Sequence, residues 1–134
     1  EVDIRLITTK HNYLANNEMI GKGIYITGND LEHWDTQTVD DSNTLNGKAI
    51  AFWMNVSGMR IPLDTKQVIL VNCRAVIVEN LNLSNLNVGI ALVNSTNIVI
   101  SRNTINSNKF QGIYLRESDN NIISNNKCNN NGME

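Results

Sequence analysis

The sequence predicts an all-β fold in which short strands wind into a parallel β-helix, a solenoid of stacked coils. Three observations support this prediction: an internal repeat of about 23 residues, short alternating apolar runs in each copy, and asparagine at matching places between the runs. Asparagine accounts for 24 of the 134 residues, whereas proline occurs once. Because asparagine is a poor strand former that tolerates the left-handed backbone of tight turns, we expect it at the corners between strands.

The first half of the chain predicts two coils, the second of them enlarged. DIRLITTKHNYLANN, from Asp3, matches GIYLRESDNNIISNN, from Gly112, and predicts a first coil over residues 3–22. GIYITGN opens a second coil over residues 23–65, which is nearly twice as long as the repeat and must contain insertions. Within it, KAIAFWMNVSGMRIPL predicts a β-hairpin with its loop at residues 55–58. DLEHWDTQT fits either a loop or a single helical turn.

Three further coils fill the second half of the chain. VGIALVNSTNIVISRNTINSN begins at Val88, and QGIYLRESDNNIISNNKCNNN begins one period later at Gln111. A period of 23 is too short for most helix-pair repeats, and the leucine scaffold of a leucine-rich repeat is missing. We therefore predict coils over residues 66–88, 89–111 and 112–134, each adding about 4.8 Å along the axis. The whole chain is then one domain, residues 1–134, of about five coils.

Stacked coils bring equivalent polar side chains above one another. An asparagine that recurs on every coil can form a ladder, because each side-chain amide can bond the coils above and below it. Three ladders are predicted, with a constant period of 23 from residue 66 onward and with Asn17 placed by the match of the first coil to the last: Asn17, Asn80, Asn103 and Asn126; Asn72, Ser95 and Ser118; Asn85, Asn108 and Asn131.

Composition excludes several classes of protein. With 41% hydrophobic and 18% charged residues the chain is typical of a globular domain. A net charge of −2 without consecutive basic residues argues against a nucleic-acid partner. No apolar run approaches the roughly 20 residues that span a bilayer. The sequence starts at Glu1 and stops within the repeat, so we expect a piece of a longer protein, whose uncapped ends would associate end to end with other copies.

The repeat also resembles a known family. GIYL followed by SDNNIISNN, and NTLNGKAIAFWMN followed by VILVNCRAVIVENLNLSNLNVGI, are similar to segments of NosD-like right-handed parallel β-helix proteins. These belong to a broader group of carbohydrate-binding and sugar-hydrolase β-helices, and the second segment resembles archaeal secreted and surface-layer members. The resemblance covers the whole chain. It implies a right-handed coil and a location outside the cell, at its surface or, in a bacterium, in the periplasm. For NosD itself it implies maturation of a copper site.

Thiols and metal ligands give little sign of a built site. Cys73 and Cys128 fall in different columns two coils apart, beyond the Cα separation of about 7 Å that a disulfide allows. We expect Cys128 to be a buried core thiol. The histidines, methionines and cysteines show no ligand spacing, so we expect no metal and no cofactor, and copper maturation is only a second alternative.

Candidate ligand-binding residues lie where the repeat is interrupted. Acidic residues cluster in the long coil between Asp30 and Asp41, where they could serve a lyase or hydrolase. Trp34 and Trp53 could be platforms for sugar rings, or could cover an open apolar edge. We take His33, Trp34, Asp35 and Trp53 as candidates and predict no catalytic residue. The sequence thus favours a non-catalytic structural or binding module that contacts polysaccharide or other cell-envelope components; the alternative is a carbohydrate-active module with its site in residues 23–65.

Overall fold

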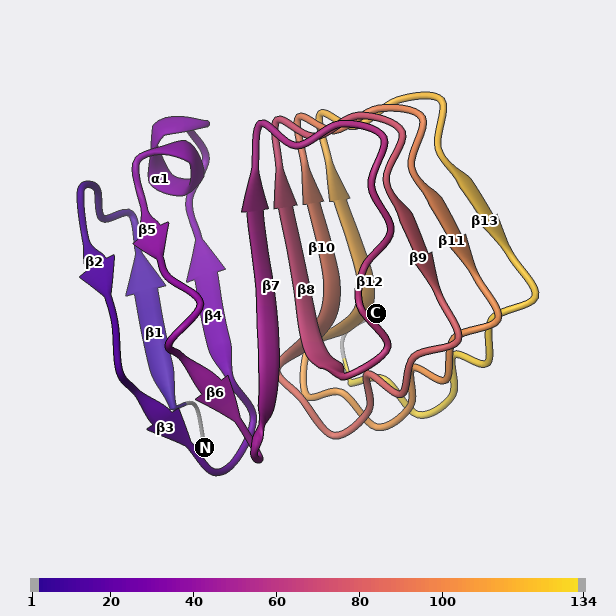
Figure 1. Cartoon of the computed structure of the whole chain (residues 1–134), viewed down its shortest axis with the longest axis horizontal. Coiled ribbons are helices and arrows are strands. Elements are labelled where there is room, and N and C mark those ends of the chain that lie inside the picture. Colours follow the sequence, from indigo (N-terminus) through magenta and orange to yellow (C-terminus); the bar gives the residue numbers. More distant parts are fainter. Residues whose placement is uncertain (1–2, 133–134) are drawn as a thin grey trace.

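The computed structural model describes residues 3–132 and confirms an all-β solenoid of stacked parallel turns (Figure 1). Residues 133 and 134 of the last expected coil, and residues 1 and 2 of the expected domain, lie outside the described residues. There are about six turns instead of five. Their elements are, in order, β1 (Ile4–Ile7), β2 (Tyr13–Leu14) and β3 (Glu18–Met19); β4 (Ile24–Thr27), α1 (Glu32–Asp35), β5 (Thr38–Val39) and β6 (Thr44–Leu45); β7 (Lys48–Met54); β8 (Thr65–Val71) and β9 (Ile77–Glu79); β10 (Val88–Val93) and β11 (Val99–Ser101); β12 (Gln111–Arg116) and β13 (Ile122–Ser124).

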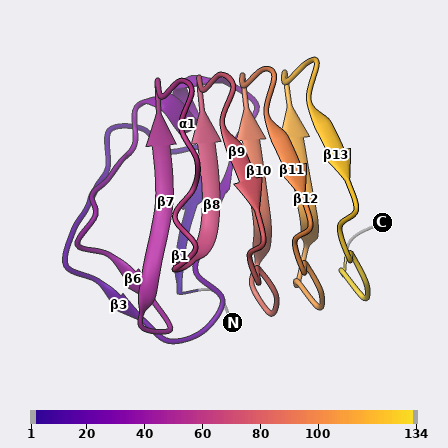
Figure 2. The same ribbon diagram turned by 45° about the vertical axis from the view of Figure 1, so that its right-hand side comes forward.

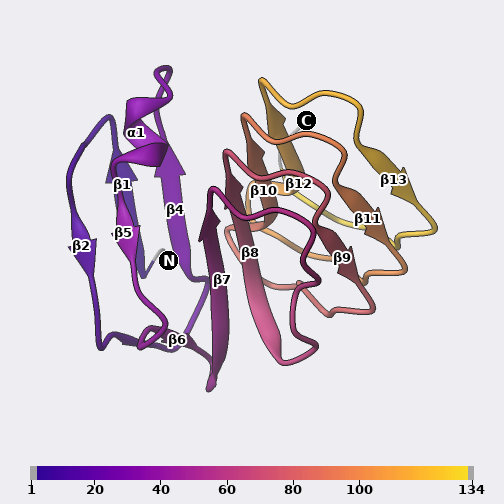
Figure 3. The same cartoon turned by 45° about the horizontal axis from the view of Figure 1, so that its top comes forward.

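The turns form two stacks that lie beside each other (Figure 3). In the N-terminal stack, β1, β2 and β3 of the first turn pair in parallel with β4, β5 and β6 of the second. In the C-terminal stack, β7, β8, β10 and β12 form one parallel sheet, and β9, β11 and β13 form another (Figure 2). The stacks are joined where β6 pairs with β7 in the antiparallel sense. We call these units the N-terminal stack and the C-terminal stack.

The reversal between the stacks is a two-residue hairpin at Asn46-Gly47. Both residues have a positive φ, 51° and 75°, as a type I′ turn requires. The predicted hairpin at residues 55–58 is therefore wrong: β7 pairs in parallel with β8, and Ser57 bridges to Arg74 in the next turn. Asn55 has a φ of 59°, like Asn72 in the following turn, so it forms a corner of the solenoid. The segment predicted as an insertion is itself the third turn.

The period is not constant. Ile90 pairs with Ile113 in the next turn and with Val68 in the previous one. Along the chain, the step from Val68 to Ile90 is one residue shorter than the step from Ile90 to Ile113. The fifth turn thus holds one residue more than the fourth. The predicted alignment of the fourth turn is consequently one residue out of register.

This shift corrects the predicted ladders. The backbone N–H of Asn103 donates to Oδ1 of Asn126 over 2.9 Å, but Oδ1 of Asn103 accepts from Leu81 and not from Asn80. Likewise the N–H of Ser95 donates to Oγ of Ser118, and that of Asn108 to Oδ1 of Asn131. Asn72, Asn80 and Asn85 are therefore wrongly placed in these ladders. The residues of the fourth turn that bond the ladder side chains are the ones that follow them, Cys73, Leu81 and Leu86. Asn17 is also wrongly placed, because its side chain bonds Asn43.

The core lies inside the C-terminal stack. Rows of inward side chains such as Leu70 and Leu92 are fully buried in the middle turns. In the last turn the inward rows are open to solvent: Leu115, in register with Leu92, is 38% exposed, and Ile123, in register with the buried Ile100, is 47% exposed. Cys128 lies in this turn and is exposed, so its prediction as a buried thiol is wrong; the free thiol that is buried is Cys73. No helix among residues 3–132 is long and apolar enough to cross a bilayer.

Candidate functional site

The residues predicted to bind a ligand fall in two places. His33, Trp34 and Asp35 lie on α1, a single helical turn in the N-terminal stack, and the first two are buried. Trp53 lies on β7 in register with Leu70, and so points toward the interior at the end of the C-terminal stack. There it lines a cavity of about 270 Å³ together with Ile50. Trp34 and Trp53 therefore do not form one platform.

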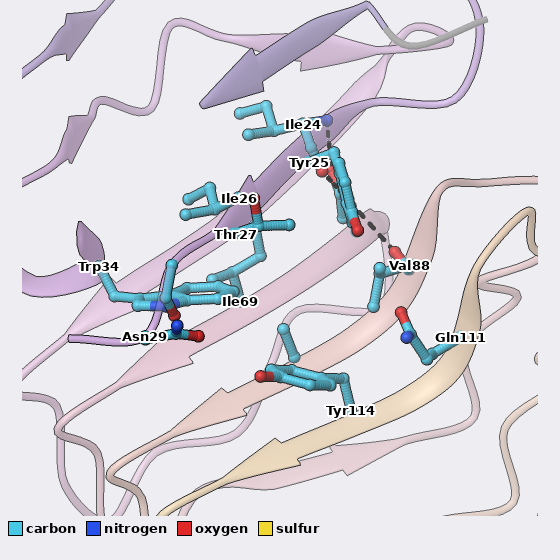
Figure 4. Close-up of a pocket in the computed structure, with 13 residues that line it drawn as sticks. Ile24, Tyr25, Ile26, Thr27, Asn29, Trp34, Ile69, Val88, Gln111 and Tyr114 are labelled. Carbon is cyan, nitrogen blue, oxygen red and sulfur yellow. Dashed lines mark hydrogen bonds between the residues drawn. The ribbon is translucent and has the colours of Figure 1, made fainter. Parts of the chain in front are cut away.

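Trp34 instead lines a cleft between the two stacks, which is the best-formed candidate site. The cleft has a volume of about 200 Å³ and lies between β4 and the outer face of the sheet formed by β8, β10 and β12 (Figure 4). Its lining is Ile24, Tyr25, Ile26, Thr27, Gly28, Asn29, Trp34, Gln67, Ile69, Val88, Ala91, Gln111 and Tyr114.

The floor of the cleft is a row of outward-facing side chains. Ile69, Ala91 and Tyr114 are in register across the three strands, and they alternate with Leu70 and Leu92, which face the core. The small Ala91 lies between the two larger residues and leaves space above the sheet. The row therefore provides an apolar floor with an aromatic ring at one end.

One end of the cleft is closed by Gln67, whose side chain joins the stacks. Its Oε1 accepts from the backbone N–H of Ile24 over 3.0 Å, and its Nε2 donates to the C=O groups of Ile24 and Val88 (dashed lines at these residues in Figure 4). Gln67 is completely buried, and these bonds satisfy its amide. Gly23 has a φ of 81°, and a Cβ there would lie 2.5 Å from Gln67 Oε1, so the close approach requires glycine.

The opposite end is closed by Arg116 and by aromatic contacts. The guanidinium of Arg116 donates to the C=O of Gly28, which also accepts a long hydrogen bond from Trp34 Nε1. The rings of Trp34 and Tyr114 are nearly parallel, at an angle of 16° with centroids 6.1 Å apart. Together they form an aromatic wall that spans both stacks.

Each described residue that lines the cleft is uncharged at neutral pH. The acidic residues of the long second coil lie outside this lining, and three of them contact other neighbours. A hydrogen bond from Lys10 lowers the pKa of Glu32, and hydrogen bonds from Ser42 and Tyr13 lower the pKa of Asp40. Asp64 forms an ion pair with Lys48 over 3.6 Å. Within residues 3–132, no group of three or more His, Cys, Asp or Glu side chains is placed to hold a metal ion.

Part of this site has a recognisable signal in the sequence. Tyr25 and Tyr114 follow Gly-Ile at the same place in two copies of the repeat, and both line the cleft. Phe110, which stacks on Tyr25 with centroids 4.4 Å apart, lies beside the extra residue of the fifth turn. Gln67, a polar residue inside an apolar strand, is a second signal. The alternation of apolar residues marks the side chains that face the core of the solenoid. It gives no sign of these contacts, because they lie on the outer face of the sheet.

Comparison with known proteins bears on the fold. A family model described as "Right handed beta helix region" matches residues 66–134, just over half of the chain. Neither the curated proteins nor the solved structures contain a match. The matched residues are the last three turns of the C-terminal stack, which include the floor of the cleft.

Proposed function

The chain belongs to the right-handed β-helix family, and from that premise we propose that it is a non-catalytic module that binds a glycan in the cleft between its stacks. The module would act outside the cytoplasm, at a cell surface or in the extracellular space, where polysaccharide is found. The observation that supports this most directly is the lining of the cleft: an aromatic wall, an apolar floor and uncharged polar groups. Such a lining suits a sugar, which has both apolar C–H faces and a rim of hydroxyl groups.

The lining also favours binding over catalysis. Hydrolysis of a glycosidic bond uses two carboxyl groups on either side of the bond. The described residues that line the cleft include none, and neither acidic residue of α1, Glu32 or Asp35, is part of the lining. A volume of about 200 Å³ is below the roughly 300 Å³ at which sites begin to enclose drug-sized ligands, so the cleft would take one sugar ring and leave the rest of the glycan in solvent.

The test is binding of the purified protein to an array of soluble polysaccharides, repeated with Ala91→Leu. Leucine at this position would fill the floor of the cleft without removing a hydrogen bond. We expect at least one polysaccharide to bind the wild type and to bind Ala91→Leu at least tenfold more weakly. Ala49→Leu, an exposed position on β7, is the matched control and should bind like the wild type. If no polysaccharide binds, or if Ala91→Leu binds normally, this function is wrong.

A further inference from the structure

We propose that the cleft holds an uncharged pyranose ring and recognises two adjacent hydroxyl groups through the backbone N–H and C=O of Ile26. This inference rests on the proposed function, and it adds the class of sugar and the way in which the sugar is held. It comes from the edge of β4, which faces the cleft, and from the charges around it.

Successive residues of β4 direct their backbone polar groups to opposite sides. Thr27 faces β1, because its C=O accepts from the N–H of Thr8 over 2.9 Å. Ile24 and Gly28 face the other way, toward Gln67 and Arg116. Because the direction alternates along a strand, the N–H and C=O of Ile26 face the cleft, midway between these two contacts. Within residues 3–132 no hydrogen bond to them is formed from that side.

Backbone groups of this kind favour a ligand that can bond them. Ile26 lines the cleft and is only 5% exposed, so its polar groups are largely removed from bulk solvent. A backbone donor or acceptor that is buried without a partner lowers the stability of the fold. A ligand that bonds both groups would recover this free energy, and it would gain orientation from two contacts at a fixed spacing.

Gln67 shows which chemistry suits this edge. Its carboxamide presents an acceptor and a donor side by side, and these bond the N–H and the C=O of Ile24. Two adjacent hydroxyl groups of a pyranose present the same combination, since one oxygen can accept while the neighbouring O–H donates. The ring that carries them would then lie over Ala91, against the wall formed by Trp34 and Tyr114.

The available edge is too short for an added peptide strand. Strand addition needs a row of free backbone groups along the edge. Here Gln67 occupies the position at Ile24 and Arg116 occupies the position at Gly28, so a single N–H and C=O pair remains between them. The ligand must therefore be compact where it meets β4.

Charge excludes acidic sugars from the same place. Two cations lie beside the lining: Arg116 already bonds the C=O of Gly28 and lies 3.2 Å from the carboxylate of Glu117, and Arg5 lies over the ring of Tyr25, 5.5 Å from its centroid. A uronate carboxylate in the cleft would lose hydration and face the carbonyl oxygens of β4 without a free cation among the described lining residues. Because burying an unpaired carboxylate is costly, the cleft selects neutral sugars.

The inference is tested by titration calorimetry with the methyl glycosides of glucose, galactose and mannose, and with those of glucuronic and galacturonic acid. We expect one neutral glycoside to bind best, and the uronate of the same configuration to bind at least tenfold more weakly. Monodeoxy forms of that best glycoside then locate the contacts. Removal of either member of one adjacent hydroxyl pair should weaken binding at least tenfold, and removal of any other hydroxyl should change it less than threefold.

The outcomes separate this inference from the function on which it rests. If polysaccharides and glycosides all fail to bind, the proposed function is wrong. If neutral sugars bind but the matching uronate binds as well, or if no adjacent pair of hydroxyls stands out, the glycan site stands and the inference is wrong. Ala91→Leu and the smaller Ala91→Val should both abolish the selectivity, with Ala49→Leu as the control. Circular dichroism melting of each variant confirms that it is folded.

Discussion

Asparagine occupies two kinds of position in each turn of this solenoid. At the corners it adopts a positive φ, as at Asn72, Asn80 and Asn85. One residue further on, its side chain bonds the neighbouring turn, as Asn103 does by accepting from Leu81 over 3.0 Å. The first role uses the tolerance of asparagine for the left-handed backbone, and the second uses its amide to satisfy a buried N–H. The two roles fall on consecutive residues, so an alignment error of one residue assigns the wrong role to each asparagine.

Ala75 is a corner residue that lacks the advantage of asparagine. Its φ is 54°, while Asn97 and Asn120 occupy the same corner in the next two turns. We expect Ala75→Asn to raise the free energy of unfolding by about 0.5–1 kcal/mol, because a side chain with Cβ is strained at this φ and asparagine offsets part of the strain. Urea unfolding measures the change. The same substitution at Ala49, an exposed strand residue, should lower stability; an unchanged or lower stability of Ala75→Asn would contradict the assigned corner.

The two cysteines differ in a way that a thiol reagent can detect. Cys73 is 2% exposed, and burial raises the pKa of its thiol. Cys128 is exposed in the last turn, and partial burial raises its pKa as well. We therefore expect Ellman's reagent to modify one thiol in the folded protein and the second only after unfolding. Since a raised pKa leaves less thiolate at neutral pH, the first reaction should be slower than that of free cysteine and should speed up as the pH rises. Equal rates for both thiols would contradict the register of the fourth turn.

Among the elements, β4 determines where the two stacks meet. It pairs with β1 on one edge, and its other edge abuts the outer face of the sheet of the C-terminal stack. Gln67 and Asn87 bond it near its start, and Arg116 bonds it near its end. The cleft exists because these contacts hold β4 close to the sheet without covering Ala91.

Gln67→Leu tests the importance of this docking. Leucine is of similar size but leaves the N–H and C=O of Ile24 without their partner, so we expect the protein to lose about 3 kcal/mol of stability. The loss should be accompanied by faster hydrogen exchange in β4 than in β10. Gln67→Glu is the companion variant, because a carboxylate can accept from Ile24 N–H but cannot donate to its C=O. Wild-type exchange in β4 of Gln67→Leu would show that the amide does not hold the stacks together.

At the level of elements the sequence is a good guide to strands and a poor one to their connections. The copies at Val88 and Gln111 align correctly because the spacing of their strands equals the period that the sequence shows. The fourth turn is misaligned because it is one residue shorter than the fifth. The difference is hard to see in the sequence because asparagine occurs at several neighbouring positions of each corner, so that a shift of one residue still matches asparagine to asparagine or serine. Residues 55–58 resemble a hairpin although Asn46-Gly47 is the stronger turn signal, because a corner and a hairpin loop have the same composition.

At the scale of the whole molecule, the two ends of the C-terminal stack differ. At one end β6 pairs with the edge of β7, which continues the sheet into the N-terminal stack. At the other end β12 and β13 have no strand beyond them among the described residues, and Leu115, Ile122 and Ile123 are exposed. An open strand edge beside exposed apolar side chains favours association with another chain.

We expect this open end to cause self-association. Sedimentation velocity at rising protein concentration should show a dimer, because the open ends of the C-terminal stacks of two copies can meet. A double substitution of Ile122 and Ile123 by serine should remove the dimer, whereas Ile20→Ser, 89% exposed in the N-terminal stack, should not. A wild-type protein that stays monomeric at high concentration would contradict the expectation.

The site depends on the whole molecule more than the strands do. The sequence singles out Trp34, either as a platform for a sugar ring or as a cover for an open apolar edge. The side chain is 3% exposed because the N-terminal stack folds onto the sheet and places it against Tyr114. His33 and Asp35 neighbour it on α1, and Trp53 covers a different cavity. No repeat pattern encodes the contact between two stacks, since the pattern records only what each turn shares with the next. Those contacts depend on single residues such as Gln67 and Arg116.

The most direct test of the glycan site is an NMR titration of the ¹⁵N-labelled protein with the methyl glycoside that binds best in calorimetry. We expect the largest shifts at the backbone amides of Ile26 and Ala91 and at the indole N–H of Trp34, with little change at the indole of Trp53. Shifts confined to Trp53 or to the open end at Ile122, or no shifts at saturating sugar, would contradict a glycan site between the stacks.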